Sequence, residues 1–226
     1  KGLTNIEAGE RRATAIAALQ SERRAANKPL AVWVTLPVIP QGLTEDGTNA
    51  ISLLLKKKVD LAGVNIMTMD YGASLKKGRS MLDGSKDALN QTVRQLGILY
   101  KKAGIPLNNE SLWSKMGATP MIGQNDVKEE IFSLDDAQKL NEFARSQKLG
   151  RMSMWSANRD VACGSNYVNV RVVSDSCSGV KQSKHKFSEL LGYGFTTSLA
   201  LSAATGTPAD KDAGEVKKDD PANSPY

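Results

Sequence analysis

Four short apolar runs, each separated from the next by sequence of helical character, constrain the fold of this chain more than any other feature. The runs are Leu30–Leu36, Val64–Tyr71, Gly117–Ile122 and Leu149–Trp155. Strands that alternate with helices are typical of repeated βα units and a parallel sheet, whereas a sandwich or a helical bundle lacks this alternation. The sequence therefore predicts an α/β protein.

The intervening segments predict helices from hydrophobic spacing and from capping residues. The expected ranges are 5–26, 44–57, 85–103, 109–115, a helix that opens at Ser133, and 184–191. The first is expected to bury an apolar stripe that includes Ile6, Ala13 and Leu19. Asp46 or Thr48 is expected to cap the second, and Ser133 to cap the fifth.

The number of strands suggests an incomplete fold. A closed (β/α)8 barrel needs eight strands, and the sequence shows four, with one helix before the first. We expect residues 1–204 to form half of a (β/α)8 TIM barrel, and a complete small α/β fold is the alternative. Residues 205–226 are rich in Ala, Gly, Pro, Asp and Lys, which predicts a flexible linker.

Composition narrows the class of protein. The net charge is +6, but basic residues are mixed with acidic ones and the run Lys56–Lys58 falls at an expected helix end, so nucleic-acid binding is not expected. No apolar run approaches the roughly 20 residues of a membrane span. Cys163 and Cys177 predict either a disulfide or two free thiols, and a disulfide would indicate a secreted protein. Because no initiating Met precedes Lys1, we expect a processed product or a fragment.

Polar residues come after the apolar runs, where an α/β barrel carries its chemistry. Asp70 and Tyr71 end the second run, and Trp155 ends the fourth. A polar cluster of Gln124, Asn125 and Asp126 comes after the third. Carboxyl ends of parallel strands face the mouth of a barrel, so these residues are candidates for one site.

Three of these segments carry a family resemblance. The stretches Val64–Gly72, Thr119–Asp126 and Gly150–Asp160 resemble strands six, seven and eight of glycoside hydrolase family 18, in particular its Pyrococcus-type microbial chitinases. The resemblance extends over residues 3–191 and identifies the four strands as strands five to eight. It implies a secreted barrel that hydrolyses the β-1,4 links of chitin or chito-oligosaccharides with retention of configuration. The N-acetyl oxygen of the substrate acts as nucleophile, so the resemblance implies no cofactor and no metal.

The general acid of this family is missing from the chain. It belongs to an Asp-x-Asp-x-Glu motif at the end of strand four, and residues 1–10 resemble the segment immediately C-terminal to that motif. We therefore expect the N-terminal half of the barrel to lie outside this chain and the chain alone to be inactive. Glu7 and Glu10 lie on a polar helix face and are not expected to replace the acid.

The resemblance also assigns roles to individual residues. It implies that Asp70 hydrogen-bonds the acetamido group and the catalytic acid, and that Tyr71 orients the N-acetyl oxygen. Here the chain departs from the commoner pattern, because Met69 stands where many members have tyrosine. Trp155 matches the tryptophan that floors a sugar subsite, and Asp126 is expected to contact the acetamido group.

The remaining candidates are less specific. Met67 and Met121 are possible sugar contacts that fit the barrel core better. Gln124 and Asn125 are expected to shape a loop or line the rim of the site.

Other features suggest rival functions. A barrel that had lost its acid would be a lectin-like binder of N-acetylglucosamine polymers. Gly123 and Gly150 would suit a phosphate-binding barrel, but no glycine-rich helix start comes after Trp155. The single histidine, His185, provides no metal-ligand cluster and no expected Cys-His nucleophile.

Overall fold

The computed structural model describes residues 3–167, 169 and 172–195. These residues belong to one compact unit, Lys1–Phe195. The linker expected at 205–226 and the last residues of the expected barrel domain, 196–204, lie outside the described residues. The described part is an α/β fold, as predicted.

The sheet is built from parallel strands that neighbour one another in chain order. Strands β1 (Val32–Ile39), β3 (Leu61–Thr68), β4 (Met116–Pro120) and β7 (Arg151–Met152) lie side by side in that sequence. They confirm the four predicted strands. β7 is shorter than expected, although a parallel bridge between Met121 and Trp155 continues the pairing beyond it. Consecutive strands that pair side by side bring all four carboxyl ends to one edge.

Three very short strands were not predicted. β2 (Gly42–Leu43) turns back on β1, while β5 (Gly123–Gln124) pairs antiparallel with β6 (Ile131–Phe132). Strands of two residues are too short to show an alternating pattern, so the sequence carries no signal for them.

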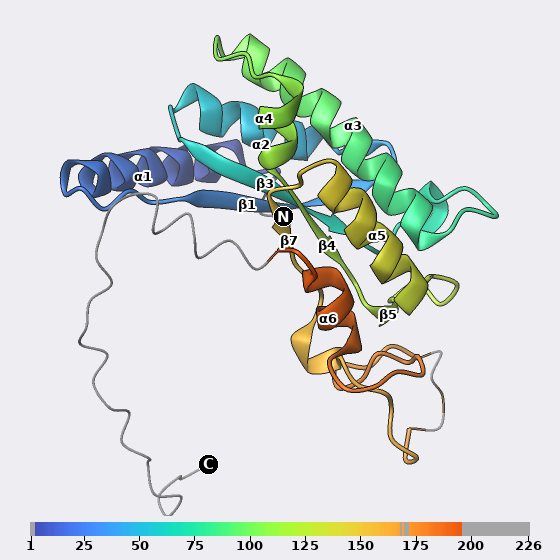
Figure 1. Ribbon diagram of the computed structural model, residues 1–226. Helices are drawn as coiled ribbons and strands as arrows, with labels where there is room; N and C mark the ends of the chain where they lie inside the picture. Colours follow the sequence, from blue (N-terminus) through green and yellow to red (C-terminus); the bar gives the residue numbers. More distant parts are fainter. Residues whose placement is uncertain (1–2, 168, 170–171, 196–226) are drawn as a thin grey trace, which may run out of the picture. The chain divides into compact units, whose positions relative to one another are not determined.

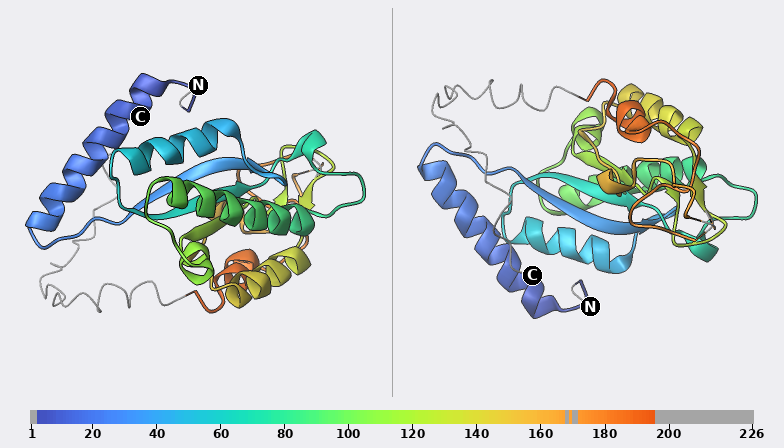
Figure 2. Two further views of the ribbon diagram at one scale, coloured as in Figure 1. Left: turned by 90° about the horizontal axis from the view of Figure 1, so that it is seen from above. Right: turned by 90° about the horizontal axis from the view of Figure 1, so that it is seen from below.

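The helices lie mainly on one side of the sheet. Their ranges are α1 Ile6–Ala25, α2 Glu45–Lys56, α3 Met81–Lys102, α4 Asn109–Ser114, α5 Leu134–Ser146 and α6 Lys186–Gly192. Two single turns of 3-10 helix, Gly72–Ser74 and Ala157–Arg159, come after β3 and β7. α2, α3 and α5 cover one face of the sheet, and α1 lies beside α2 at the β1 edge (Figure 1). The view from below in Figure 2 shows β1 and β3 without a covering helix.

Capping residues explain where the helices begin. Thr44, rather than the expected Asp46 or Thr48, caps α2, because its hydroxyl accepts a hydrogen bond from the amide of Gly47. α3 begins four residues earlier than expected, since Ser80 and Asp83 form a capping box.

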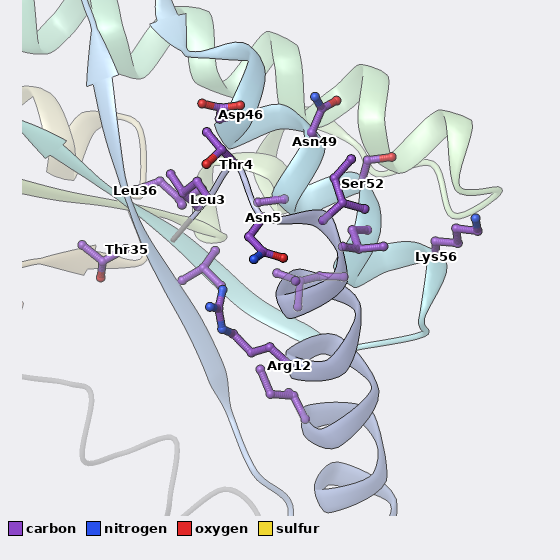
Figure 3. Close-up of a pocket in the computed structure, with 17 residues that line it drawn as sticks. Leu3, Thr4, Asn5, Arg12, Thr35, Leu36, Asp46, Asn49, Ser52 and Lys56 are labelled. Carbon is purple, nitrogen blue, oxygen red and sulfur yellow. The ribbon is translucent and has the colours of Figure 1, made fainter. Parts of the chain in front are cut away.

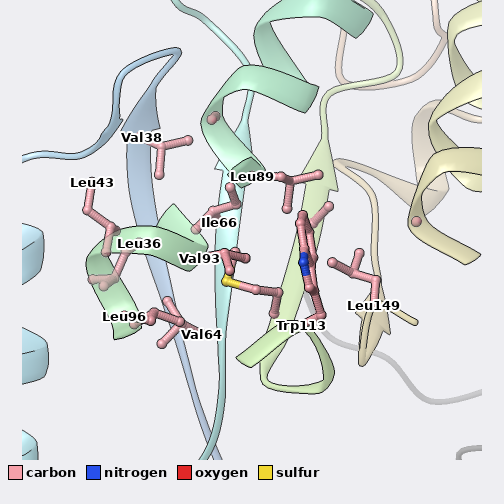
Figure 4. Close-up of a cluster of buried hydrophobic side chains, with 14 of the residues drawn as sticks. Leu36, Val38, Leu43, Val64, Ile66, Leu89, Val93, Leu96, Trp113 and Leu149 are labelled. Carbon is pink, nitrogen blue, oxygen red and sulfur yellow. The ribbon is translucent and has the colours of Figure 1, made fainter. Parts of the chain in front are cut away.

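The core lies between the helices and the sheet. Leu89, Val93 and Leu96 of α3 pack against Val64 and Ile66 of β3 (Figure 4). Further members of the cluster are Leu36, Val38, Leu43, Trp113 and Leu149. Alternate residues of these strands must therefore face the side of the sheet that no helix covers.

That second face is polar where β1, β3 and β4 meet. The Asn65 amide nitrogen donates to the hydroxyls of Thr119 and Thr35, at 2.7 and 3.3 Å. Its carbonyl oxygen is buried and has no hydrogen-bond partner among the described residues. Near the amino ends of the strands, the Arg151 guanidinium stacks on the Trp33 ring with 4.4 Å to its centre.

The apolar stripe expected on α1 is only partly buried. Ala13 is inaccessible, but Ile6 is 73% exposed and Leu19 is 46% exposed. The prediction was wrong for these two side chains because α2 is the main element that α1 packs against in the described part of the chain. None of the helices in residues 3–195 that the structure describes is long and apolar enough to cross a membrane.

The capping box of α5 yields a stability prediction. Ser133 accepts from the Asp136 amide at 3.0 Å, and the Asp136 carboxylate accepts from the Ser133 amide at 2.8 Å. Ser133→Ala is expected to lower the free energy of unfolding by about 1 kcal/mol in urea denaturation. Ser146→Ala, at the exposed end of the same helix, is the control and should stay within about 0.5 kcal/mol of the native value. Equal effects of the two substitutions on the free energy of unfolding would contradict the assignment of Ser133 as the stabilising cap of α5.

Candidate functional site

The candidate site lies where the loops after β3, β4 and β7 meet at the carboxyl edge of the sheet. Asp70 comes after β3, Asp126 after β5, and Trp155 after β7. Parallel pairing of β3 with β4, and of β4 with β7, brings these loops to the same edge. The topology thus places the three loops at one edge, and their role as a site stays a prediction.

Asp70 is fixed by the loop after β4. Its backbone has a φ of 50°, in the left-handed region that residues with a side chain seldom adopt. The Asp70 amide donates to the side-chain oxygen of Asn125 at 3.2 Å. In return, the Asp126 amide donates to Oδ1 of Asp70 at 2.8 Å. The loop after β3 and the loop after β4 therefore each donate a hydrogen bond to the other.

Tyr71 points away from Asp70 and into the core. It is 4% exposed, its ring lies against Gly84, and its hydroxyl is 3.4 Å from Oγ of Ser85 in α3. Burial raises the pKa of the phenol, so the hydroxyl stays protonated. The left-handed backbone at Asp70 interrupts the alternation of side chains along the strand. The position of Tyr71 in the sequence therefore does not predict the side on which its ring lies.

Glu130 is a site residue that sequence reasoning missed. It is 4% exposed, and its two carboxylate oxygens accept from the amides of Tyr71 and Gly72, at 2.9 and 2.6 Å. It lies in neither a predicted strand nor a predicted helix, and its partners are 58 and 59 residues away in the chain. No local sequence signal could have identified it.

Arg159 is a second residue that was not assigned a role. Its side chain is fully buried, and it donates to the carbonyls of Gln124 and Ser174, at 2.6 and 2.7 Å. Burial lowers the pKa of the guanidinium, while the charges of Asp126 and Asp70 oppose that shift. Arg159 thus places a positive charge near the carboxylates of Asp70 and Asp126.

Gln124 and Asn125 hold the loop after β4 together. The Gln124 amide nitrogen donates to the Lys128 carbonyl at 3.1 Å, and it also reaches the carbonyls of Asn125, Val127 and Glu130. The Asn125 amide nitrogen donates to the Met121 and Gly123 carbonyls. Both side chains are buried, so their contacts shape the loop.

Trp155 presents a half-exposed aromatic ring at this edge. It is 53% exposed, and the peptide bond between it and Ser156 is cis. Its amide donates to the Pro120 carbonyl, and its carbonyl accepts from the Ile122 amide, so its backbone is bound to the end of β4. Met121 is buried beside it, and Met67 of β3 is half-buried.

The segment after Trp155 is joined to the site by a disulfide-bonded loop. Cys163 and Cys177 form a disulfide, which confirms one of the two predicted alternatives. The Ser178 carbonyl then accepts from the backbone N–H of Gln124 at 2.8 Å. Gly123, with a φ of 70°, makes this approach possible, because a Cβ there would lie 1.9 Å from that carbonyl oxygen.

Burial dominates the electrostatics of the two carboxyl groups. Loss of solvent raises the pKa of Asp70, although hydrogen bonds from the Asp126 and Val127 amides counteract it. Loss of solvent likewise raises the pKa of Glu130, despite its bonds to Tyr71 and Gly72. No group of three or more His, Cys, Asp or Glu residues in the described part of the chain could hold a metal ion.

The raised pKa of Asp70 predicts a pH-dependent stability difference. A folded-state pKa above the unfolded value means that ionisation weakens folding as pH rises through the folded pKa. Asp70→Asn, which keeps the acceptor oxygen, should therefore raise Tm relative to the native chain at pH 7. This gain should shrink when pH falls below the usual aspartate value of 3.8. Thermal unfolding monitored by circular dichroism measures both values, and a gain that grows in acid would contradict the sign.

Comparison with known proteins adds sequence relatives. No protein-family model matches the chain. It is 36% identical over 159 residues to a probable bifunctional chitinase/lysozyme of Escherichia coli, covering 70% of this chain and 18% of that protein. It is 36% identical over 155 residues to Endochitinase 11 of Metarhizium anisopliae, covering 67% of this chain and 30% of the relative. The chain thus spans less than a third of either relative.

Solved structures give a consistent result. The catalytic domain of the hyperthermophilic chitinase from Pyrococcus furiosus matches with a TM-score of 0.69 and 28% identity, over 89% of this chain and 59% of that one. A catalytic-site mutant of active domain 2 of a chitinase from the same organism, in complex with chito-oligosaccharides, also matches with a TM-score of 0.69, over 58% of its length. The agreement of sequence and structure shows that this chain is related to the chitinases and corresponds to part of a chitinase catalytic domain.

Proposed function

We propose that this chain is the C-terminal half of a glycoside hydrolase family 18 catalytic barrel, comprising strands five to eight. Its function is to bind the acetamido sugars of chitin or chito-oligosaccharides for hydrolysis of their β-1,4 links. The proposal is supported by the placement of Asp70, Asp126 and Trp155 in loops at the carboxyl edge of neighbouring parallel strands. The related domain from Pyrococcus furiosus in complex with chito-oligosaccharides supports the class of ligand.

The open side of the sheet supports the half-barrel arrangement. Along Val32–Pro37, the outer edge of β1 pairs with no strand in the described part of the chain. A cavity of about 570 Å³ lies between this edge, α1 and α2, and it is lined by Val34 and Leu36 among others (Figure 3). The exposed Ile6 and Leu19 of α1 suit a helix that has lost a neighbour. A preceding strand parallel to β1 would cover these surfaces.

The proposed chemistry divides between the two halves. Trp155 provides an apolar surface for the face of an acetylated sugar, and Asp70 and Asp126 provide acceptors for its acetamido N–H. The acetamido oxygen attacks the anomeric carbon, while an acid from the preceding half of the barrel protonates the leaving oxygen. Tyr71 supports this site from the core rather than by contact with the sugar, since its hydroxyl faces Ser85.

Secretion is part of the proposal. The disulfide between Cys163 and Cys177 suits an oxidising compartment such as the extracellular space.

The role of Trp155 can be tested by ligand affinity. Trp155→Ala is expected to weaken binding of chitotetraose about tenfold, or about 1.4 kcal/mol, because the stacking surface is lost. Isothermal titration calorimetry on the full chain measures the affinity. Tyr193→Ala, which removes another exposed aromatic ring, is the control and should leave affinity unchanged. Unaltered affinity in the Trp155 variant would place the sugar elsewhere.

The division of the site can be tested by activity. The 226-residue chain alone should release no products from chitotetraose, because the Asp-x-Asp-x-Glu motif that carries the acid does not occur in its sequence. A polypeptide extended through the preceding half of the barrel should release them, with product analysis by chromatography as the measurement. Turnover by the chain alone would contradict the division, and binding without turnover by the extended protein would indicate a lectin.

A further inference from the structure

Three consecutive backbone N–H groups after β3 all donate to side chains of a single loop. The amide of Asp70 donates to Asn125 at 3.2 Å, that of Tyr71 to Glu130 at 2.9 Å, and that of Gly72 to Glu130 at 2.6 Å. Glu130 therefore accounts for two of the three bonds, one through each carboxylate oxygen.

This turn has a backbone that needs external support. Asp70 has a φ of 50° and Gly72 a φ of 53°, so two of three residues are left-handed, and an aspartate in that region carries a steric penalty. The direction of the Asp70 carboxylate depends on this backbone. That carboxylate in turn accepts from the Asp126 amide, which makes the Asp126 N–H a reporter of where Asp70 points.

Glu130 is suited to hold the turn and not to touch a sugar. It is almost fully buried, and its backbone carbonyl accepts from the Asn125 amide at 3.0 Å, which fixes its own position. A carboxylate offers acceptors on both oxygens, whereas glutamine would turn an NH2 group towards one of the two amides. Charge-assisted bonds to backbone amides are also stronger than neutral ones.

We propose that Glu130 is a positioning residue that sets the direction of Asp70 through the amides of Tyr71 and Gly72. In this role it determines the preference of the site for an acetamido group over a hydroxyl group. The second statement rests on the proposed function of Asp70, whereas the first does not.

The first statement is tested by amide hydrogen exchange in the full chain. Glu130→Gln should speed exchange about tenfold, for the loss of one hydrogen bond, at whichever of the Tyr71 and Gly72 amides faces the new NH2 group, and also at the Asp126 amide. Exchange in β3, for example at Ile66, should be unchanged. Glu129→Gln removes the same charge from the exposed neighbouring residue and should leave all four amides unaffected. Faster exchange at the Tyr71 or Gly72 amide without a change at Asp126 would overturn the proposal.

A second variant distinguishes a change in the direction of Asp70 from a general loss of order in the loop that contains Glu130. Glu130→Asp keeps the charge on a shorter side chain and should give an intermediate exchange rate at Asp126. The backbone N–H of Gln124, which donates to the Ser178 carbonyl, should stay protected from exchange in both variants. Loss of protection there in both would mean that Glu130 serves the loop fold and not the direction of Asp70.

The second statement is tested by ligand preference. Glu130→Gln should weaken binding of chitotetraose about tenfold and leave binding of cellotetraose unchanged, because cellotetraose has hydroxyl groups in place of acetamido groups. A general defect would weaken both ligands equally and would overturn this statement. If the native chain binds neither ligand, the proposed function fails, while the exchange measurements still decide the role of Glu130.

Discussion

Pairing of consecutive parallel strands in register is the constraint on which the rest of the structure depends. After β1, β3 and β4 the chain returns through helices to the edge at which the next parallel strand begins, so the loops that carry polar residues collect on the opposite edge. Val64 and Ile66 hold the helices on one face, which leaves Asn65 and Met67 on the other. A shift of one residue in β3 would exchange these two sets.

The candidate site is built largely from backbone groups that side chains hold in place. Glu130 accepts from two amides and Arg159 donates to two carbonyls, and neither side chain is exposed. The groups left nearer to solvent are Asp70, Asp126 and Trp155. This arrangement separates residues that define the shape of the site from residues that can meet a ligand. Burial of carboxyl groups there costs stability, which is a usual feature of functional sites.

The sequence predicted the repeated parts of the fold and missed the parts that depend on distant contacts. The four parallel strands and six helices were found because their apolar patterns are long enough to be distinctive. Asp70 and Trp155 were recognised because they end such strands. The direction of Tyr71 could not be deduced, since it depends on a left-handed residue that no local pattern marks. Glu130 was missed because its partners lie more than 50 residues away, and Ile6 was assigned to a core that its side chain does not reach.

The outer edge of β1, which pairs with no strand among the residues that the structure describes, has a consequence for the behaviour of the isolated chain in solution. An edge strand with free amides and carbonyls is a template for pairing with another polypeptide, and proteins usually protect such edges with charges or short strands. Along Val32–Leu36 the strand itself carries no charged side chain, and the adjoining cavity is lined by both apolar residues such as Leu53 and polar ones such as Arg12. Concentrated preparations would consequently be prone to self-association through intermolecular sheet, and their solubility would depend on whatever polypeptide covers that edge.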